Sequence, residues 1–202
     1  MEKTTSLGFV ISANGIEIDP SKADAIHNWE TPKCVKDVQC FLGFANFSWR
    51  FIYKYSGICQ PLFNLLWKDT QFVWSSGCEQ VFSQLKTAFT STPILHDFDP
   101  ELETILETDA SDYIISGVLS QKHPDLDTKK LILHLVAFMS EKMSPAECNY
   151  RISDKELLAI ISSSEKWQIY LYQLPRPFTI LTDHHNLQTF TTKNLLSRRQ
   201  AR

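Results

Sequence analysis

The sequence predicts an α+β fold, with a helical first half and a second half in the order β-β-β-α-β. Three observations carry this prediction. Apolar residues recur at helical spacing through most of residues 20–93. Three strand-like runs follow residue 101. A long helical pattern then separates them from a fourth apolar run that ends in Thr182-Asp183. Residues 97–100 are expected to link the two halves.

The first half opens with an apolar strand from Leu7 to Ile11 and a turn at Asn14-Gly15. Asp19-Pro20 is typical of an N-cap followed by proline at the first helical position, and predicts a helix to about Trp29. Further helices are expected around three apolar sets: Val35, Val38, Leu42 and Ala45; Leu62, Leu65 and Leu66; and Val81, Phe82, Leu85 and Ala88.

The second half is expected to hold strands at 103–109, 114–121, 131–138 and 178–183. The first three suggest an antiparallel meander. A helix is predicted over 153–172, and a short helix from about Asn186. The inner face of the helix at 153–172 is predicted to carry Leu157, Ile160, Ile161, Ser164, Trp167 and Leu171. A right-handed crossover through this helix makes the first and last strands parallel if they are neighbours.

Three acids mark one edge of this expected sheet. Asp109 and Asp183 each end a strand in a Thr-Asp pair, and Glu156 lies in the expected first turn of the helix between them. The carboxyl ends of parallel neighbours meet at one edge, so we expect these acids to gather there. Three clustered carboxylates repel one another unless a cation is present. Two Mg²⁺ ions held there could activate a water against a phosphodiester.

The same acids also have structural interpretations. Aspartate favours turns, so Asp109 and Asp183 could cap strand ends. Glu156 completes the pattern Ser153-x-x-Glu156, which is typical of a capping box. From the residues alone, a metal site and a set of structural caps both stay open.

Composition narrows the class of protein. The chain has 202 residues, which allows one large domain or two small ones, and 43% of them are hydrophobic, enough to bury a core. No apolar run is long enough to cross a bilayer, and the first residues lack the apolar stretch of a secretory signal. We therefore expect an intracellular protein, in the cytoplasm or nucleus, with no membrane partner. The five cysteines form no Cys-x-x-Cys pair, which argues against a zinc or redox motif.

The net charge of −3 argues weakly against a general nucleic-acid binder. The distribution of charge softens this argument, because the last ten residues contain Lys193, Arg198, Arg199 and Arg202 and no acid. A basic end of this kind can contact phosphates. A solvated tail is the alternative interpretation.

Many ordered segments carry a family resemblance. In the first half they are Leu7-Gly8-Phe9-Val10-Ile11-Ser12, Asp19-Pro20-Ser21-Lys22, Phe41-Leu42-Gly43-Phe44-Ala45-Asn46-Phe47, Arg50-Phe51-Ile52 and Phe72-Val73-Trp74. In the second half they are Thr108-Asp109-Ala110-Ser111, Gly117-Val118-Leu119-Ser120-Gln121, Asp154-Lys155-Glu156-Leu157-Leu158-Ala159-Ile160 and Leu181-Thr182-Asp183-His184-His185-Asn186-Leu187. Together they resemble the pol polyprotein of gypsy-type LTR retrotransposons, from the end of reverse transcriptase into ribonuclease H.

The resemblance implies two domains. Residues 1–96 resemble the palm end and the thumb or connection of reverse transcriptase. Residues 101–202 resemble a ribonuclease H domain that is truncated before its C-terminal strand and helix. The Tyr-x-Asp-Asp polymerase motif is absent, so no polymerase activity is expected from this chain. Ser116-Gly117 stands where the family usually has Gly-Ala, which could disturb the second strand.

The resemblance also implies roles for the acids. Asp109, Glu156 and Asp183 match the family's metal-binding catalytic residues, which hold two Mg²⁺ ions, with Mn²⁺ as a possible substitute. The family's fourth acid lies beyond Arg202. The implied partners are an RNA–DNA hybrid duplex and the rest of the pol polyprotein.

The expected activity is therefore metal-dependent hydrolysis of the RNA strand of an RNA–DNA hybrid. Arg50 in the thumb-like region and Arg198, Arg199 and Arg202 in the basic end are candidate contacts to the duplex. Two alternatives remain open: a catalytically inactive retroelement relic and a non-catalytic nucleic-acid-binding module.

Overall fold

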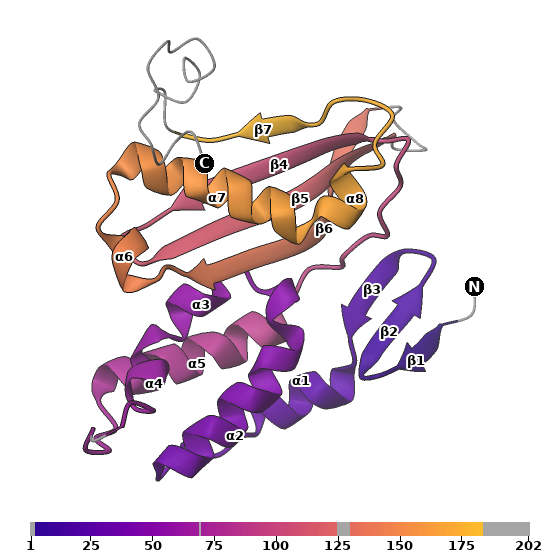
Figure 1. The fold of residues 1–202 in the computed structure, drawn as a ribbon. Helices are drawn as coiled ribbons and strands as arrows, with labels where there is room; N and C mark the ends of the chain where they lie inside the picture. Colours follow the sequence, from indigo (N-terminus) through magenta and orange to yellow (C-terminus); the bar gives the residue numbers. More distant parts are fainter. Residues whose placement is uncertain (1–2, 69, 125–129, 184–202) are drawn as a thin grey trace. The chain divides into compact units, whose positions relative to one another are not determined.

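The computed structural model describes residues 3–68, 70–124 and 130–183. The chain forms two compact units. The first contains the described residues up to Asp97 together with Leu135–Phe138, and the second contains the remainder. Each unit combines strands with helices (Figure 1). The order of elements confirms the predicted α+β class, since a mainly helical half precedes a mixed sheet.

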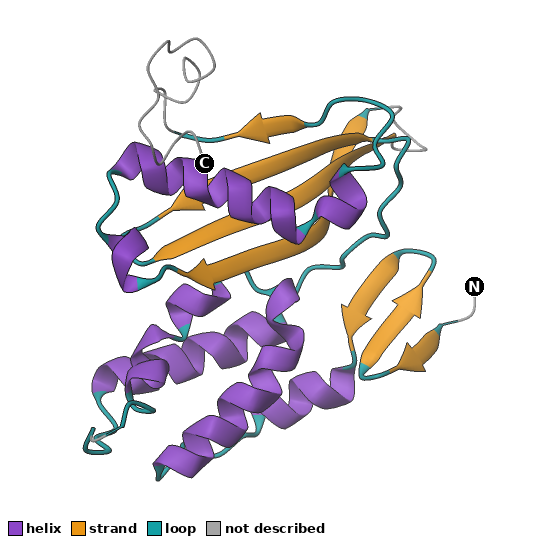
Figure 2. Cartoon of the chain, in the orientation of Figure 1, coloured by secondary structure: helices purple, strands orange, loops and turns teal. Residues whose placement is uncertain are grey.

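The first unit opens with a small antiparallel sheet in the order β1-β2-β3 (Figure 2). Its strands are β1 (Thr4–Ser6), β2 (Phe9–Ser12) and β3 (Gly15–Ile18). Strand β2 therefore starts two residues later than the predicted strand, because Leu7 and Gly8 form the turn between β1 and β2 with φ angles of 51° and 78°. Positive φ at both positions suits a tight hairpin turn.

Helices make up the rest of the first unit. They are α1 (Pro20–His27), α2 (Val35–Ala45), the 3₁₀ helix η1 (Asn46–Phe51), α3 (Tyr55–Ile58), α4 (Gln60–Asn64) and α5 (Ser76–Thr90). The Asp19 side chain accepts a hydrogen bond from the Ser21 amide at 2.9 Å, which confirms the predicted N-cap of α1. Helix α2 buries Val38, Leu42 and Ala45 of the predicted set and also Phe41, whereas Val35 is half-buried.

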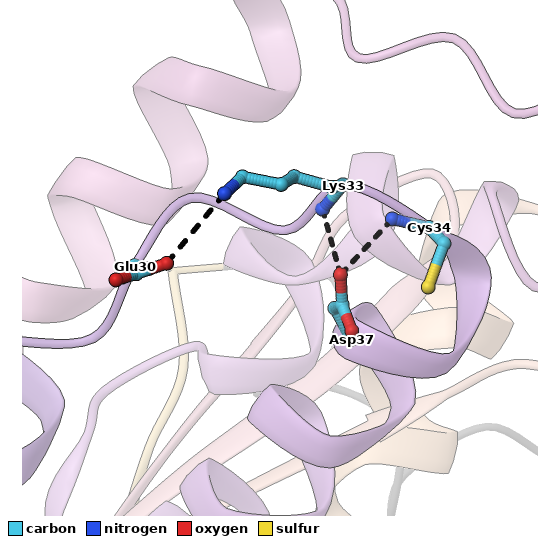
Figure 3. Close-up of polar contacts among 4 residues, drawn as sticks. All are labelled: Glu30, Lys33, Cys34 and Asp37. Atoms are coloured by element: carbon cyan, nitrogen blue, oxygen red, sulfur yellow. Dashed lines mark hydrogen bonds and ion pairs between the residues drawn. The ribbon is translucent and has the colours of Figure 1, made fainter.

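The N-terminus of α2 is held by one carboxylate. Asp37 Oδ2 accepts hydrogen bonds from the backbone amides of Lys33 and Cys34, at 2.9 and 3.2 Å (Figure 3). These amides would otherwise lack partners at the start of the helix. The Lys33 ammonium also lies 3.7 Å from the Glu30 carboxylate. The helix therefore begins just after Pro32, which the sequence identifies as a helix breaker.

The second unit is built on a four-stranded sheet in the order β6-β5-β4-β7, of which the middle of β6, Leu135–Phe138, is grouped with the first unit. Its strands are β4 (Glu103–Ala110), β5 (Ile114–Pro124), β6 (Leu131–Lys142) and β7 (Thr179–Leu181). Strands β4 and β5 are antiparallel, whereas β4 and β7 are parallel. Both relationships were predicted. Strand β5 runs unbroken through Ser116-Gly117, so the expected disturbance there is wrong.

Helix α7 (Ile152–Lys166) is the crossover between the sheet strands, and it packs on β4 and β5 (Figure 1). The short helices α6 (Pro145–Cys148) and α8 (Gln168–Leu171) flank it. The single helix predicted over 153–172 is therefore wrong at Trp167, where α7 ends and α8 begins. The short helix expected from Asn186 lies outside the described residues.

The buried face of α7 differs from the predicted one. Within the helix, Lys155, Glu156, Ala159 and Ser163 are buried, and Ile161 is 46% exposed. Of the six residues predicted on the inner face, only Trp167 and Leu171 are buried. Leu157, Ile160 and Ile161 were placed there because they are apolar, and none of the three is buried. Small side chains let the helix approach the sheet closely, which outweighs the hydrophobicity of the neighbouring face.

No helix in the described ranges combines the length and the apolar character needed to cross a bilayer.

Candidate active site

The register of the β4–β7 pair aligns two of the predicted acids. Ile105 pairs with Thr179, Leu106 with Ile180 and Glu107 with Leu181. Continuing this parallel register by two residues places Asp183 level with Asp109. Asp183 follows the end of β7 and is exposed, whereas Asp109 lies within β4. The carboxyl ends of two neighbouring parallel strands therefore each carry an aspartate.

Asp109 is held by the adjacent strand rather than placed in a turn. Its ladder partner is Ser116 of β5. The Ser116 hydroxyl lies 3.3 Å from the Asp109 carbonyl oxygen and 3.5 Å from Oδ2, and donates toward both. The carboxylate of Asp109 is partly exposed. Strand pairing thus orients this residue within β4.

Glu156 comes to the same edge from α7. The N-cap of α7 is Arg151, so Glu156 lies in the second helical turn rather than the first, and Ser153 is not a cap. The capping-box interpretation of Glu156 is therefore wrong. The residue is only 2% exposed, and its Oε1 accepts a hydrogen bond from the Ala110 amide at 3.3 Å. This bond ties the helix to the last residue of β4.

The electrostatic environment of Glu156 includes the other two acids. Burial, and after it the negative charges of Asp183 and Asp109, raise the pKa of the Glu156 carboxyl from its usual 4.5 to about 7. The Ala110 amide and the polar side chain of Thr182 act in the opposite direction. Near neutral pH this carboxyl is consequently divided between its protonated and charged forms. A cation at this position would favour the charged form.

The residues fit a divalent metal in their chemistry. The Glu156 Oε2 atom is buried and receives no hydrogen bond, although buried carboxylate oxygens normally have partners. The three side chains offer hard oxygen ligands of the kind that Mg²⁺ prefers. Across the described part of the chain, however, no three Asp, Glu, His or Cys side chains already form a group that could hold a metal ion.

The predicted nucleic-acid contacts are less well placed. Arg50 lies in η1, is half-buried, and its guanidinium is 6.0 Å from the centroid of the Phe51 ring. Arg198, Arg199 and Arg202 lie outside the described residues. Of these four arginines, the structure therefore describes Arg50 alone.

One buried charge near the site was missed by the sequence analysis. Lys155 is 6% exposed, and its Nζ donates a hydrogen bond to the Asp112 carbonyl at 3.1 Å. A lysine in a helix is normally read as part of the solvated face. Only its position, directly before Glu156 in the resemblance segment, could have indicated a role. Asp112 contributes its backbone carbonyl to this contact.

Comparison with known proteins places the chain in a family. A family model described as an RNase H-like domain found in reverse transcriptase matches residues 74–180, which include Asp109 and Glu156. The Tf2-3 and Tf2-4 transposon polyproteins of Schizosaccharomyces pombe are each 41% identical to the chain over 181 residues. That alignment covers 90% of this chain, which spans 13% of the length of each polyprotein.

Solved structures share the fold. The foamy viral protease-reverse transcriptase in complex with dsDNA matches with a TM-score of 0.75 and 21% identity, over 96% of this chain and 39% of that one. The same viral protein in complex with an RNA/DNA hybrid matches with a TM-score of 0.72 and 21% identity, over 98% of this chain and 27% of that one. At this identity the likeness concerns the fold.

Proposed function

The chain belongs to the family of RNase H-like domains found in reverse transcriptases, and we propose that it hydrolyses the RNA strand of RNA–DNA hybrids in a divalent-metal-dependent reaction. It would act as a segment of a gypsy-type retrotransposon pol polyprotein. Residues 1–96 would form the thumb or connection of the reverse transcriptase, and residues 101–202 the ribonuclease H domain. The hybrid would be recognised through its backbone shape and 2′-hydroxyls rather than its bases.

A single observation carries this proposal. The buried Glu156 of α7 accepts a hydrogen bond from the Ala110 amide, next to Asp109 of β4, and the parallel register of β4 and β7 sets Asp183, just after β7, level with Asp109. Three carboxylates from separate elements are thus directed to one edge of the sheet. Perturbed carboxyls that share an edge are typical of functional sites. The family membership supports the same assignment.

The chain's own residues have distinct tasks in this scheme. Asp109, Glu156 and Asp183 would hold two Mg²⁺ ions, or Mn²⁺, through carboxylate oxygens. Glu156 must lose its proton before it can bind a cation, since burial favours its protonated form. Ser116 and Ala110 hold Asp109 and Glu156 in place through hydrogen bonds. The bound ions would supply a Lewis acid for water activation and positive charge for the phosphate.

The test is a cleavage assay on a hybrid whose RNA strand carries an end label, with Mg²⁺ and with a chelator. Asp109→Asn and Glu156→Gln should each abolish metal-dependent cleavage. Glu165→Gln is the matched control, since Glu165 is an exposed acid on the same helix. Cleavage that survives Asp109→Asn would overturn the proposed site.

A non-catalytic nucleic-acid-binding module is the second candidate. The observation that favours it is the likeness of the fold to the foamy viral protease-reverse transcriptase, which was solved in complex with dsDNA and with an RNA/DNA hybrid. It predicts hybrid binding that weakens steeply with salt, together with no cleavage at any Mg²⁺ concentration. Binding measured by fluorescence anisotropy beside the cleavage assay separates the two candidates.

A further inference from the structure

A buried lysine stands beside the acids and has no assigned role. Lys155 directly precedes Glu156 in α7 and is 6% exposed. Lysine is almost never buried to this extent, because removing an ammonium from water is costly. A single hydrogen bond to a carbonyl oxygen offsets only part of that cost, so stability alone is a poor reason for a buried lysine.

The partner of Lys155 shows where it acts. Its Nζ donates to the carbonyl oxygen of Asp112 at 3.1 Å. Asp112 lies in the turn that joins β4 to β5, three residues after Asp109. The turn is also closed by a hydrogen bond from the Ser111 amide to the Ile114 carbonyl at 2.8 Å. The ammonium group therefore holds the turn against α7.

Two consecutive residues of α7 thus form hydrogen bonds to the chain at the C-terminal end of β4 and in the turn that follows. Glu156 accepts from the Ala110 amide, and Lys155 donates to the Asp112 carbonyl. The two bonds have opposite polarity, so they fix both the distance and the orientation of the helix relative to this segment. Asp109 directly precedes the segment that they hold.

We infer that Lys155 is a positioning residue, which clips the β4–β5 turn to α7 so that the carboxylates of Asp109 and Glu156 are presented to the same divalent ion. This inference rests on the proposed function. Residues that orient metal ligands typically change metal affinity by 10–100-fold when they are removed. Loss of the clip should therefore weaken metal binding even though Lys155 itself contacts no metal.

The test measures Mn²⁺ affinity by electron paramagnetic resonance on the full chain. Lys155→Met, which keeps the length but not the donor, should weaken Mn²⁺ binding by about tenfold. Lys155→Arg keeps a charged donor and should restore most of the affinity. Lys122→Met is the matched control, because Lys122 pairs with Glu103 at the opposite end of β4 and its loss should leave Mn²⁺ binding unchanged.

A second measurement needs no variant. Linkage is reciprocal, so Mn²⁺ should slow hydrogen exchange of the Ser111 amide in the unmodified chain if the position of the turn affects metal binding. Lys155→Met should accelerate exchange of the Ser111 amide. Exchange of the Lys122 amide, which is far from the turn, should stay unchanged. If Lys155→Met does not fold, the effect of Mn²⁺ on the unmodified chain decides the question.

The outcomes separate this inference from the proposed function. Unchanged Mn²⁺ affinity in folded Lys155→Met, or no effect of bound Mn²⁺ on Ser111 exchange, overturns the positioning role and leaves the metal site standing. An unmodified chain that binds Mn²⁺ no better than Asp109→Asn overturns the proposed function, and the positioning role with it.

Discussion

Ser163 of α7 packs directly on Gly117 of β5, so closely that a Cβ atom on Gly117 would lie 2.5 Å from Ser163 Oγ. The same Cβ would lie 3.2 Å from a ring carbon of Trp167. Real Cβ atoms essentially never approach another heavy atom to 2.5 Å. The absence of a side chain at Gly117 therefore allows α7 to lie as near to the sheet as it does, and the same helix carries Glu156.

Gly117→Ala should lower the free energy of unfolding by about 1–3 kcal/mol, because an added methyl group overpacks this contact. Urea denaturation followed by circular dichroism measures the change. Adding Ser163→Ala should recover part of the loss, since it removes the nearest atom. Gly43→Ala is the control: a Cβ there meets nothing within 4 Å, and alanine in a helix is neutral or stabilising by up to about 1 kcal/mol. Equal effects at the two glycines would contradict the close packing.

The stability of the metal-free chain should fall as pH rises from about 4.5 to 7. The folded pKa of Glu156 is raised to about 7 from 4.5, so the folded state holds a proton that the unfolded state has already released in this window. The contribution of protonated Glu156 to the free energy of unfolding is fully present below pH 4.5 and is lost as the pH rises through 7. It amounts to about 3 kcal/mol at most, from the size of the shift.

Urea unfolding in a chelating buffer at several pH values tests this dependence. Glu156→Gln cannot titrate, so the difference in unfolding free energy between the two proteins isolates the contribution of Glu156. The variant should be relatively more stable at pH 8 than at pH 5, compared with the unmodified chain. A pH dependence that is identical in both proteins would show that Glu156 is not perturbed.

Divalent metal should stabilise the chain at pH 7. Mg²⁺ that binds only the folded state adds about 1.4 kcal/mol when its concentration is near ten times its Kd. We expect a higher melting temperature with Mg²⁺ by scanning calorimetry, reversed by a chelator. The increase should disappear in Asp109→Asn and persist in Glu165→Gln. An increase of the same size in all three proteins would indicate nonspecific ion binding.

Substitution of Gln121 should lower the free energy of unfolding more than substitution of most other polar residues in the second unit. It is fully buried, and its amide group bonds the backbone N–H and C=O of Asp99, at 2.9 and 2.7 Å, and the Thr104 hydroxyl at 3.0 Å. Gln121→Leu keeps the volume but leaves these groups without that partner, which should cost about 2–4 kcal/mol. Gln168→Leu, at an exposed position of α8, is the control for urea denaturation. A cost below that of the control would refute the role of Gln121 as an anchor.

Local signals in the sequence predicted much of the fold. Three such signals are the Asp19-Pro20 cap, the spacing of Val38 and Leu42, and the apolar runs of the sheet. Each depends on residues only a few positions apart, so each can be predicted from the sequence. Strand β1 escaped prediction because Thr4-Thr5-Ser6 contains no apolar residue, and pairing with β2 alone makes it a strand.

By itself, the sequence determined the α+β class, the order of the strands and the long helix in the second half, and the identity of the candidate acids. Tertiary structure alone decided which face of α7 is buried, that Glu156 is not a helix cap, and that Lys155 bonds the turn after Asp109. The physical reason is that these features depend on close approach between distant segments. The small residues Gly117, Ala159 and Ser163 permit that approach, and an apolar pattern along one helix does not encode it.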